Sequence, residues 1–201
     1  MAKVRLYGKK DLRIAAYNRS GARFFLSLAE KQEEGQFYSA QASLLFSAFT
    51  HEAFLNNLGT RIIKDWSQHD RDTPKAKLTV ICNTISYKPN MGTRPYQTLT
   101  ELFRFRNLIV HGREETISTP AKGKVVTRVD KGGYLDALEG KWERYCTVQN
   151  ARKAYDDVGG IAADLCDKAG IRKFAGFPFG TLASGMYQIR ELETASTSIR
   201  T

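Results

Sequence analysis

The sequence predicts a mainly α fold, a helical bundle with a small β-hairpin inserted before its last long helix. Apolar residues recur at spacings of three and four over several segments, which is the period of one buried helix face. β-Branched residues gather in two short runs, 116–119 and 124–129, on either side of Pro120 and Gly123, as is typical of a hairpin. The chain has 201 residues, 42% of them hydrophobic, so it is long enough to bury a core.

The longest helical pattern covers residues 36–65 and should form the central helix of the bundle. A shorter helix is expected before it, capped by Asn18 or Ser20 and ending near Gly35. The predicted buried faces are Phe24, Phe25, Leu28 and Ala29 in the first helix, and Phe37, Ala40, Leu44, Leu45, Ala48, Phe49, Leu55, Leu58 and Ile62 in the central one.

Two further helices are expected before the hairpin. Thr73 followed by Pro74 is typical of a helix start, because threonine caps the first turn and proline suits the first helical position. The helical spacing returns from Pro95, and Gly112 favours a left-handed helix end. The apolar positions of these two helices are Leu78, Ile81, Cys82 and Ile85, then Leu99, Leu102, Phe103, Ile109 and Val110.

After the hairpin, residues 142–146 predict a third short strand. Thr147 should then begin a last amphipathic helix that ends at Gly170. Its predicted stripe is Val148, Ala151, Tyr155, Val158, Ala162, Leu165 and Ala169.

The chain is therefore expected to have three parts. Residues 1–35 form an N-terminal extension with a helix, and residues 36–170 form the helical domain, with the hairpin at about 115–130. Residues 171–201 form a C-terminal tail that is rich in Gly, Ser and Thr and should pack loosely.

The net charge of +10 predicts attraction to polyanions, of which phosphate backbones are the commonest in a cell. The same charge could instead serve solubility alone. The basic residues are spread along the chain, which indicates a folded basic face and not a disordered basic arm.

The sequence favours a cytoplasmic location. The three cysteines, Cys82, Cys146 and Cys166, are widely spaced and form no CxxC pair, so a disulfide framework and a zinc site are both disfavoured. No apolar run resembles a signal peptide or approaches the length of a membrane span. We expect no association with a membrane.

No metal site and no cofactor are expected. His51 and Glu52 begin a sequence like the zinc-protease HExxH motif, but Leu55 takes the position of the second histidine. The chain has three histidines in total, and no P-loop or dinucleotide fingerprint occurs.

Two opposite charges lie on apolar helix faces. At about 100° per residue, Arg106 falls near the middle of the apolar side of its helix, and Glu52 falls within the apolar stripe of the central helix. A charge buried without a partner costs several kcal/mol, about 3–5 when a buried pair is broken. We therefore expect Arg106 and Glu52 to meet or to share a polar network. One interpretation is that they form an ion pair whose only role is to fix the register of the two helices.

His111 adds a group that such an ion pair does not require. It lies five residues after Arg106, about 140° away on an ideal helix, but at the helix end it could turn back toward a shared cleft. Histidine titrates near neutrality and can move a proton, whereas arginine stays charged and matches phosphate oxygens. In a basic protein, the set formed by Arg106, Asn107 and His111 thus suggests cleavage of a phosphodiester without metal. The plainer interpretation is that His111 is a lone histidine without a catalytic role.

The stretch Arg106-Asn107-Leu108-Ile109-Val110-His111 resembles the R-x4-H motif of HEPN domains, which are helical ribonucleases of toxin-antitoxin, phage-defence and RNA-processing systems. The segment 48–58, with Glu52 among aromatic and aliphatic residues, is similar to an early helix of that family. The helix from Thr147 also resembles the family's C-terminal helix. The likeness spans roughly residues 36–170.

The resemblance implies a homodimer in which two copies of the motif helix form one composite cleft. Arg106 would bind and polarise the phosphate, and His111 would do acid-base work. Asn107 would contact or orient substrate and Glu52 would support the site. Cleavage would need no metal and would leave a cyclic phosphate.

We therefore predict a dimeric endoribonuclease that acts as a toxin or defence effector, with Arg104 and Arg113 as surface charges that guide RNA. A cognate antitoxin or partner defence protein could accompany it. The alternatives are a non-catalytic HEPN module that binds nucleic acid or a partner protein, and a helical scaffold in which Arg106 and Glu52 are only a core ion pair.

Overall fold

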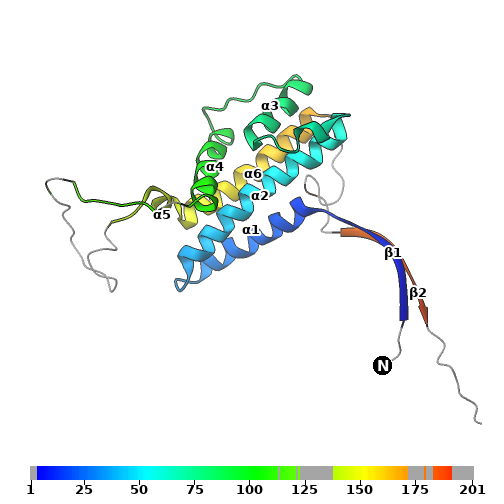
Figure 1. The fold of residues 1–201 in the computed structure, drawn as a ribbon, viewed down its shortest axis with the longest axis horizontal. Helices are drawn as coiled ribbons and strands as arrows, with labels where there is room; N and C mark the ends of the chain where they lie inside the picture. The colour runs from blue at the N-terminus through cyan, green and yellow to red at the C-terminus, as the bar shows by residue number, and fades with distance from the viewer. Residues whose placement is uncertain are drawn as a thin grey trace, which may run out of the picture.

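The computed structural model describes residues 4–112, 114–120, 122, 138–171, 179 and 183–191. The prediction of a mainly α bundle with a small β element is confirmed (Figure 1). No helix of this part of the chain combines the length and the apolar character needed to cross a membrane. The elements are β1 (Val4–Leu12), α1 (Ile14–Lys31), α2 (Gln36–Ile62), the 3-10 helix η1 (Trp66–His69), α3 (Pro74–Thr84), α4 (Tyr96–Val110), α5 (Lys141–Tyr145), α6 (Val148–Lys168) and β2 (Ala183–Glu191).

Helix α2 lies in the middle of the bundle, as the sequence predicts. It contacts α1, α3, α4, α6 and η1, and Figure 1 shows α1 and α6 running alongside it. A single apolar core joins these helices, and its fully buried members include Leu26, Leu44, Leu55, Ile81, Leu102, Ile161 and Leu165.

Helix α1 differs from the prediction in both its start and its buried face. It begins at Ile14, and its buried residues are Ala15, Ala16, Ala22, Leu26 and Ala29. Phe24, expected in the core, is 59% exposed. The small residues let α1 approach α2 closely: a Cβ on Gly21 would lie 3.0 Å from the Phe46 ring. Because Ala15, Leu26 and Ala29 belong to the common core, α1 packs as part of the bundle.

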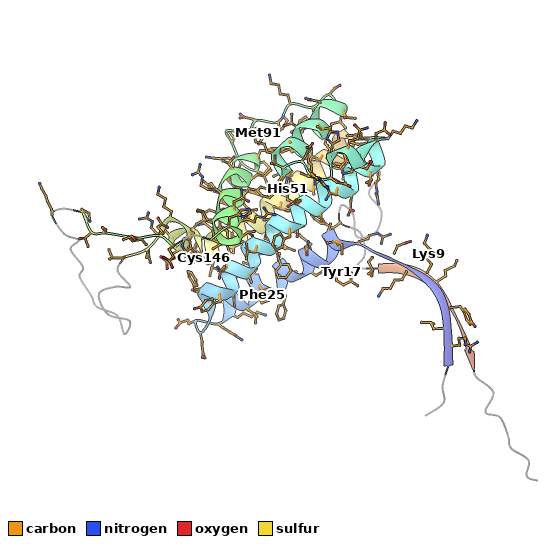
Figure 2. All side chains as sticks on the ribbon, in the orientation of Figure 1. Lys9, Tyr17, Phe25, His51, Met91 and Cys146 are labelled. Atoms are coloured by element: carbon orange, nitrogen blue, oxygen red, sulfur yellow. The ribbon has the colours of Figure 1, made fainter. Side chains whose placement is uncertain are left out.

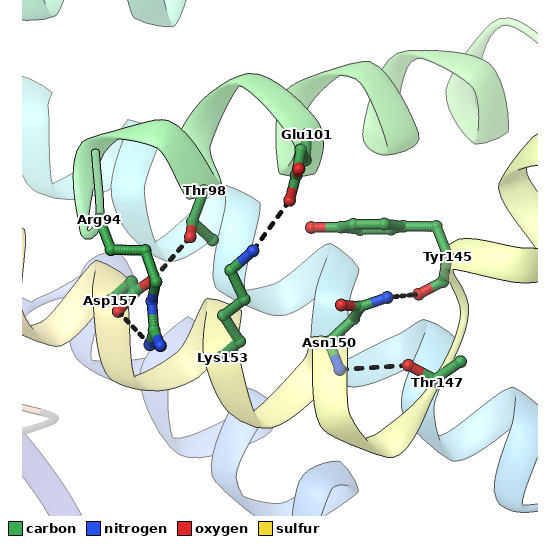
Figure 3. Close-up of polar contacts among 8 residues, drawn as sticks. All are labelled: Arg94, Thr98, Glu101, Tyr145, Thr147, Asn150, Lys153 and Asp157. Atoms are coloured by element: carbon green, nitrogen blue, oxygen red, sulfur yellow. Dashed lines mark hydrogen bonds and ion pairs between the residues drawn. The ribbon is translucent and has the colours of Figure 1, made fainter. Parts of the chain in front are cut away.

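The predicted capping threonines are confirmed. The side chain of Thr73 accepts a hydrogen bond from the backbone N–H of Ala76, at the start of α3. Thr147 accepts one from Asn150 in the same way, at the start of α6 (Figure 3). Gly170, with a φ of 66°, takes the left-handed conformation expected after the last helix.

Two local predictions are wrong. Residues 141–145 form helix α5 where a third strand was expected, and the Glu143 carboxylate accepts a hydrogen bond from the Gly140 N–H at its first turn. Gly112 does not adopt a left-handed conformation. Helix α4 ends at Val110, and the next residue, His111, leaves the helical range with a φ of −106° and a ψ of 29°, without a positive φ.

The β element of this structure joins the two ends of the described chain. Strands β1 and β2 pair antiparallel, with Val4 opposite Glu191 and Leu12 opposite Ala183, and they project from the bundle as a ribbon (Figure 1). The stretch 183–191 falls in the segment expected to pack loosely. At the predicted hairpin, residues 114–120 form no strand, and the second run, 124–129, lies outside the described residues.

Helix α4 and the residues just before it are fastened to α6 by polar contacts, several of them to the buried Asp157. The Asp157 carboxylate accepts hydrogen bonds from the Arg94 guanidinium at 2.8 and 2.9 Å and from the Thr98 hydroxyl at 2.6 Å (Figure 3). One helical turn away, Lys153 donates to Glu101 at 3.0 Å. These contacts fix the position of α4 along its first half, upstream of the motif that starts at Arg106.

Candidate functional site

A cavity of about 590 Å³ brings the predicted site residues together. Helix α2 supplies His51 and Glu52, and the last turns of α4 supply Arg106, Asn107 and His111. The lining is completed by Asp72 and the start of α3 with its apolar Leu78, by Met91 on the connection to α4, and by Leu99, Thr100 and Phe103 of α4. Residues separated by some 50 positions in the sequence thus face one space.

The expected contact between Arg106 and Glu52 is confirmed. Arg106 Nη2 donates to Glu52 Oε2 at 3.3 Å, and the two side chains are 23% and 28% exposed. Arg106 Nη1 donates to Asn107 Oδ1 at 3.0 Å. Arg106 Nε is buried and has no hydrogen-bond partner among the described residues. The guanidinium is therefore held from two sides, and Nη1 and Nη2 each keep a second N–H that these two contacts do not use.

His111 lies at the end of α4 and is exposed to solvent. Its backbone N–H donates to the Asn107 carbonyl at 3.0 Å, which continues the helical hydrogen-bonding pattern by one residue. Although an ideal helix would point His111 away from Arg106, both side chains line the same cavity. The imidazole is open to water and to a ligand, as proton transfer requires.

The two flanking arginines are less involved in this site. Arg104 is exposed on α4 and does not line the cavity. Arg113 lies outside the described residues, so its expected role is a prediction only. Lys75, at the start of α3, is an exposed cation that does line the cavity.

His51 is the site residue that the sequence interpretation missed. It is 1% exposed, and neither ring nitrogen has a hydrogen-bond partner among the described residues. Figure 2 shows it within the bundle. Burial lowers the pKa of His51 to about 4, so the ring is neutral at physiological pH. The signal in the sequence that could have identified His51 as buried is its position on the buried stripe, three residues after Ala48 and four before Leu55.

The described residues offer neither a metal site nor a reactive thiol. They contain no cluster of three or more His, Cys, Asp or Glu side chains that could hold a metal ion. Burial raises the pKa of Cys82 to about 11 and of Cys146 and Cys166 to about 12, so these thiols remain protonated at neutral pH and are poor nucleophiles.

No family model, curated protein or solved structure matches this chain. The assignment of a function therefore depends on the geometry of Arg106, Asn107 and His111 and on the resemblance of their spacing to the HEPN motif.

The burial of His51 predicts a specific loss of stability in acid. Its pKa is about 4 in the folded protein and about 6.5 in the unfolded chain. Between these values the unfolded chain binds more protons, so the free energy of unfolding should fall as the pH falls from about 6.5 to 4, by up to about 3 kcal/mol from this group. Chemical denaturation of wild type and His51→Leu across this range measures the effect.

The comparison between the two proteins isolates His51 from the carboxylates, which titrate in both. His51→Leu should be at least as stable as wild type at pH 7, because it removes buried polar atoms that have no partner. Its advantage should grow as the pH falls. A difference between the two that stays constant from pH 7 to pH 4.5 would show that the His51 pKa is not depressed.

Proposed function

We propose that this protein is a metal-independent endoribonuclease of the HEPN type, as the R-x4-H spacing suggests. The observation that carries the proposal is the cavity that Arg106, Asn107 and His111 share with Glu52. It combines a fixed cation suited to a phosphate with an exposed imidazole suited to proton transfer.

The reaction we propose is attack of a ribose 2′-hydroxyl on the adjacent phosphate. His111 removes the 2′-hydroxyl proton, and the 2′-oxygen forms a bond to phosphorus. The bond from phosphorus to the 5′-oxygen then breaks, and this oxygen takes up a proton from an imidazolium, leaving a 2′,3′-cyclic phosphate and a 5′-hydroxyl. Arg106 stabilises the charge that builds on the phosphate oxygens in the transition state.

Glu52 fits a supporting role in this scheme. Its carboxylate would repel a phosphate, but its contact with Arg106 Nη2 holds the guanidinium in one orientation. Arginine has five N–H donors, so the guanidinium can keep Glu52 and Asn107 as partners and still meet a phosphate. The net charge of +10 and the exposed Lys75 at the cavity favour a polyanionic substrate.

Two exposed apolar side chains support the proposal of a homodimer. Leu108 is 45% exposed and Val110 51% exposed, on the last turn of α4 beside His111. Covering them with the same helix of a second copy would remove apolar surface from water and bring two copies of the motif together. A toxin or defence role, a cognate antitoxin and a cytoplasmic location are what the resemblance and the composition add to this proposal.

The contact between Arg106 and Glu52 favours a second candidate, a module that binds nucleic acid or a partner protein without cleaving it. Arg106 already has a carboxylate partner, so its place on the helix is explained without catalysis. Activity measurements on variants separate the two candidates.

Purified protein should cleave single-stranded RNA in the presence of EDTA, and His111→Ala should lower the rate at least about 100-fold, because general acid-base catalysis typically contributes that much. His111 is exposed, so this variant should keep the stability of wild type. Lys31→Ala, which removes an exposed cation that does not line the cavity, is the matched control and should cleave like wild type.

Two outcomes would contradict the assignment. If wild type does not cleave RNA, or if His111→Ala and Arg106→Ala both cleave at the rate of wild type, the site is not catalytic. Salt-sensitive RNA binding without cleavage would then favour the binding module.

The homodimer predicts that Val110→Asp lowers the mass in solution from that of two chains to that of one. An aspartate in a desolvated apolar interface would be an unpaired buried charge. Sedimentation at micromolar concentration measures the mass. Tyr38→Asp, which replaces a side chain that is 72% exposed on α2, is the control and should remain dimeric. A wild-type protein that is strictly monomeric would remove the composite cleft.

A further inference from the structure

The two ring nitrogens of His51 indicate a binding site for a ligand, because they are buried without hydrogen-bond partners among the described residues. A neutral imidazole carries one N–H donor and one acceptor, and buried polar groups of proteins are nearly always hydrogen-bonded. Neither His51 nitrogen has a partner among the described residues, and the Ser47 hydroxyl one turn earlier on α2 is unpartnered as well. His51 lines the cavity, although its nitrogens are closed to solvent in this structure, so a ligand that enters the cavity can bond them once the side chains that cover them shift.

The surroundings of His51 suit a flat ligand with a polar edge. Leu78, Leu99, Phe103 and Met91 give the cavity apolar walls, and the rings of His51 and Phe103 lie 5.8 Å apart between centroids. The volume of about 590 Å³ is within the range of about 300–1,000 Å³ that is usual for small-molecule sites. Apolar and aromatic side chains that stack, with a few polar groups at the edge, are how proteins bind unpaired bases of RNA.

The charges in the cavity favour a base, and not a phosphate, as the group that reaches His51. Its imidazole is neutral because of its burial, so it offers hydrogen bonds and no positive charge. Arg106 and Lys75 are the cations that line the cavity, and Arg106 pairs with Glu52, the residue next to His51. A nucleotide that lies across the cavity can therefore place its phosphate at Arg106 and its base at His51.

We propose that this cavity is a nucleobase pocket, which takes one unpaired base next to the phosphate held by Arg106, with His51 hydrogen-bonding the edge of that base. The inference rests on the proposed function for the identity of the strand as RNA. It adds that cleavage is base-selective and that a duplex is not a substrate, because a paired base cannot enter the pocket.

The pocket can be tested without cleavage, by titrating the full-length protein with each of the four nucleoside 5′-monophosphates and with ribose 5-phosphate. We expect at least one mononucleotide to bind five-fold or more tightly than ribose 5-phosphate. In His51→Phe, which keeps a planar ring but has no ring nitrogens, this advantage should be lost while ribose 5-phosphate binds as before. His51→Leu serves in the same way if the phenylalanine variant does not fold.

The second measurement maps cleavage sites on a pool of single-stranded RNA of random sequence. Wild type and Lys31→Ala should cut beside one preferred base, and the cuts made by His51→Phe should show no such preference. Equal binding of all mononucleotides and ribose 5-phosphate, no binding of any of them, or unchanged base preference in His51→Phe would overturn the pocket. If RNA is not cleaved at all while one mononucleotide is preferred, the proposed nuclease fails and the pocket stands.

Discussion

The arrangement of the helices and of the candidate site depends on the burial of α2. This helix is packed against α1, α3, α4, α6 and η1, so each polar group on its buried face must find its partner inside the bundle. The Ser43 hydroxyl donates to the Ala22 carbonyl of α1 at 2.9 Å, and Glu52 accepts from Arg106 of α4. His51 alone lines the cavity with two ring nitrogens unpartnered by the described residues. Each unpaired buried group costs about 1–3 kcal/mol, so its retention is more easily explained by a ligand than by stability.

Helix α4 connects that buried helix to the surface. Its first half is fixed on α6, through Asp157 and through the hydroxyl of Tyr96, which donates to Asp164 at 2.8 Å. Burial and the hydrogen bond with Asp164 raise the pKa of Tyr96, so the phenol remains a donor at neutral pH. With this half fastened, the last turn presents His111 to solvent while Arg106 stays partly enclosed. One helix thus carries a held cation and an accessible proton carrier, the combination that phosphodiester cleavage without metal would use.

The parts of the fold that could be predicted from the sequence are those with local signals. The central helix and the caps at Thr73 and Thr147 follow from spacing within a few turns. The pairing of β1 with β2 could not be predicted, because the two strands lie about 180 residues apart and no turn sequence connects them directly. The buried face of α1 consists of four alanines and Leu26, and alanines contribute little to a hydrophobic periodicity. In the site, helix arithmetic found the Arg106 and Glu52 contact, whereas the role of His51 needed the cavity in three dimensions.

In the proposed reaction the ribose 2′-hydroxyl attacks the phosphate held at Arg106, and a change to the substrate tests this step without altering the protein. The measurement compares cleavage in EDTA of an all-ribose oligonucleotide with that of the same sequence carrying a single 2′-deoxyribose at the mapped cut site. Cleavage at the modified position should be lost while other sites are cut as before. Cleavage that continues at the 2′-deoxy position would contradict it.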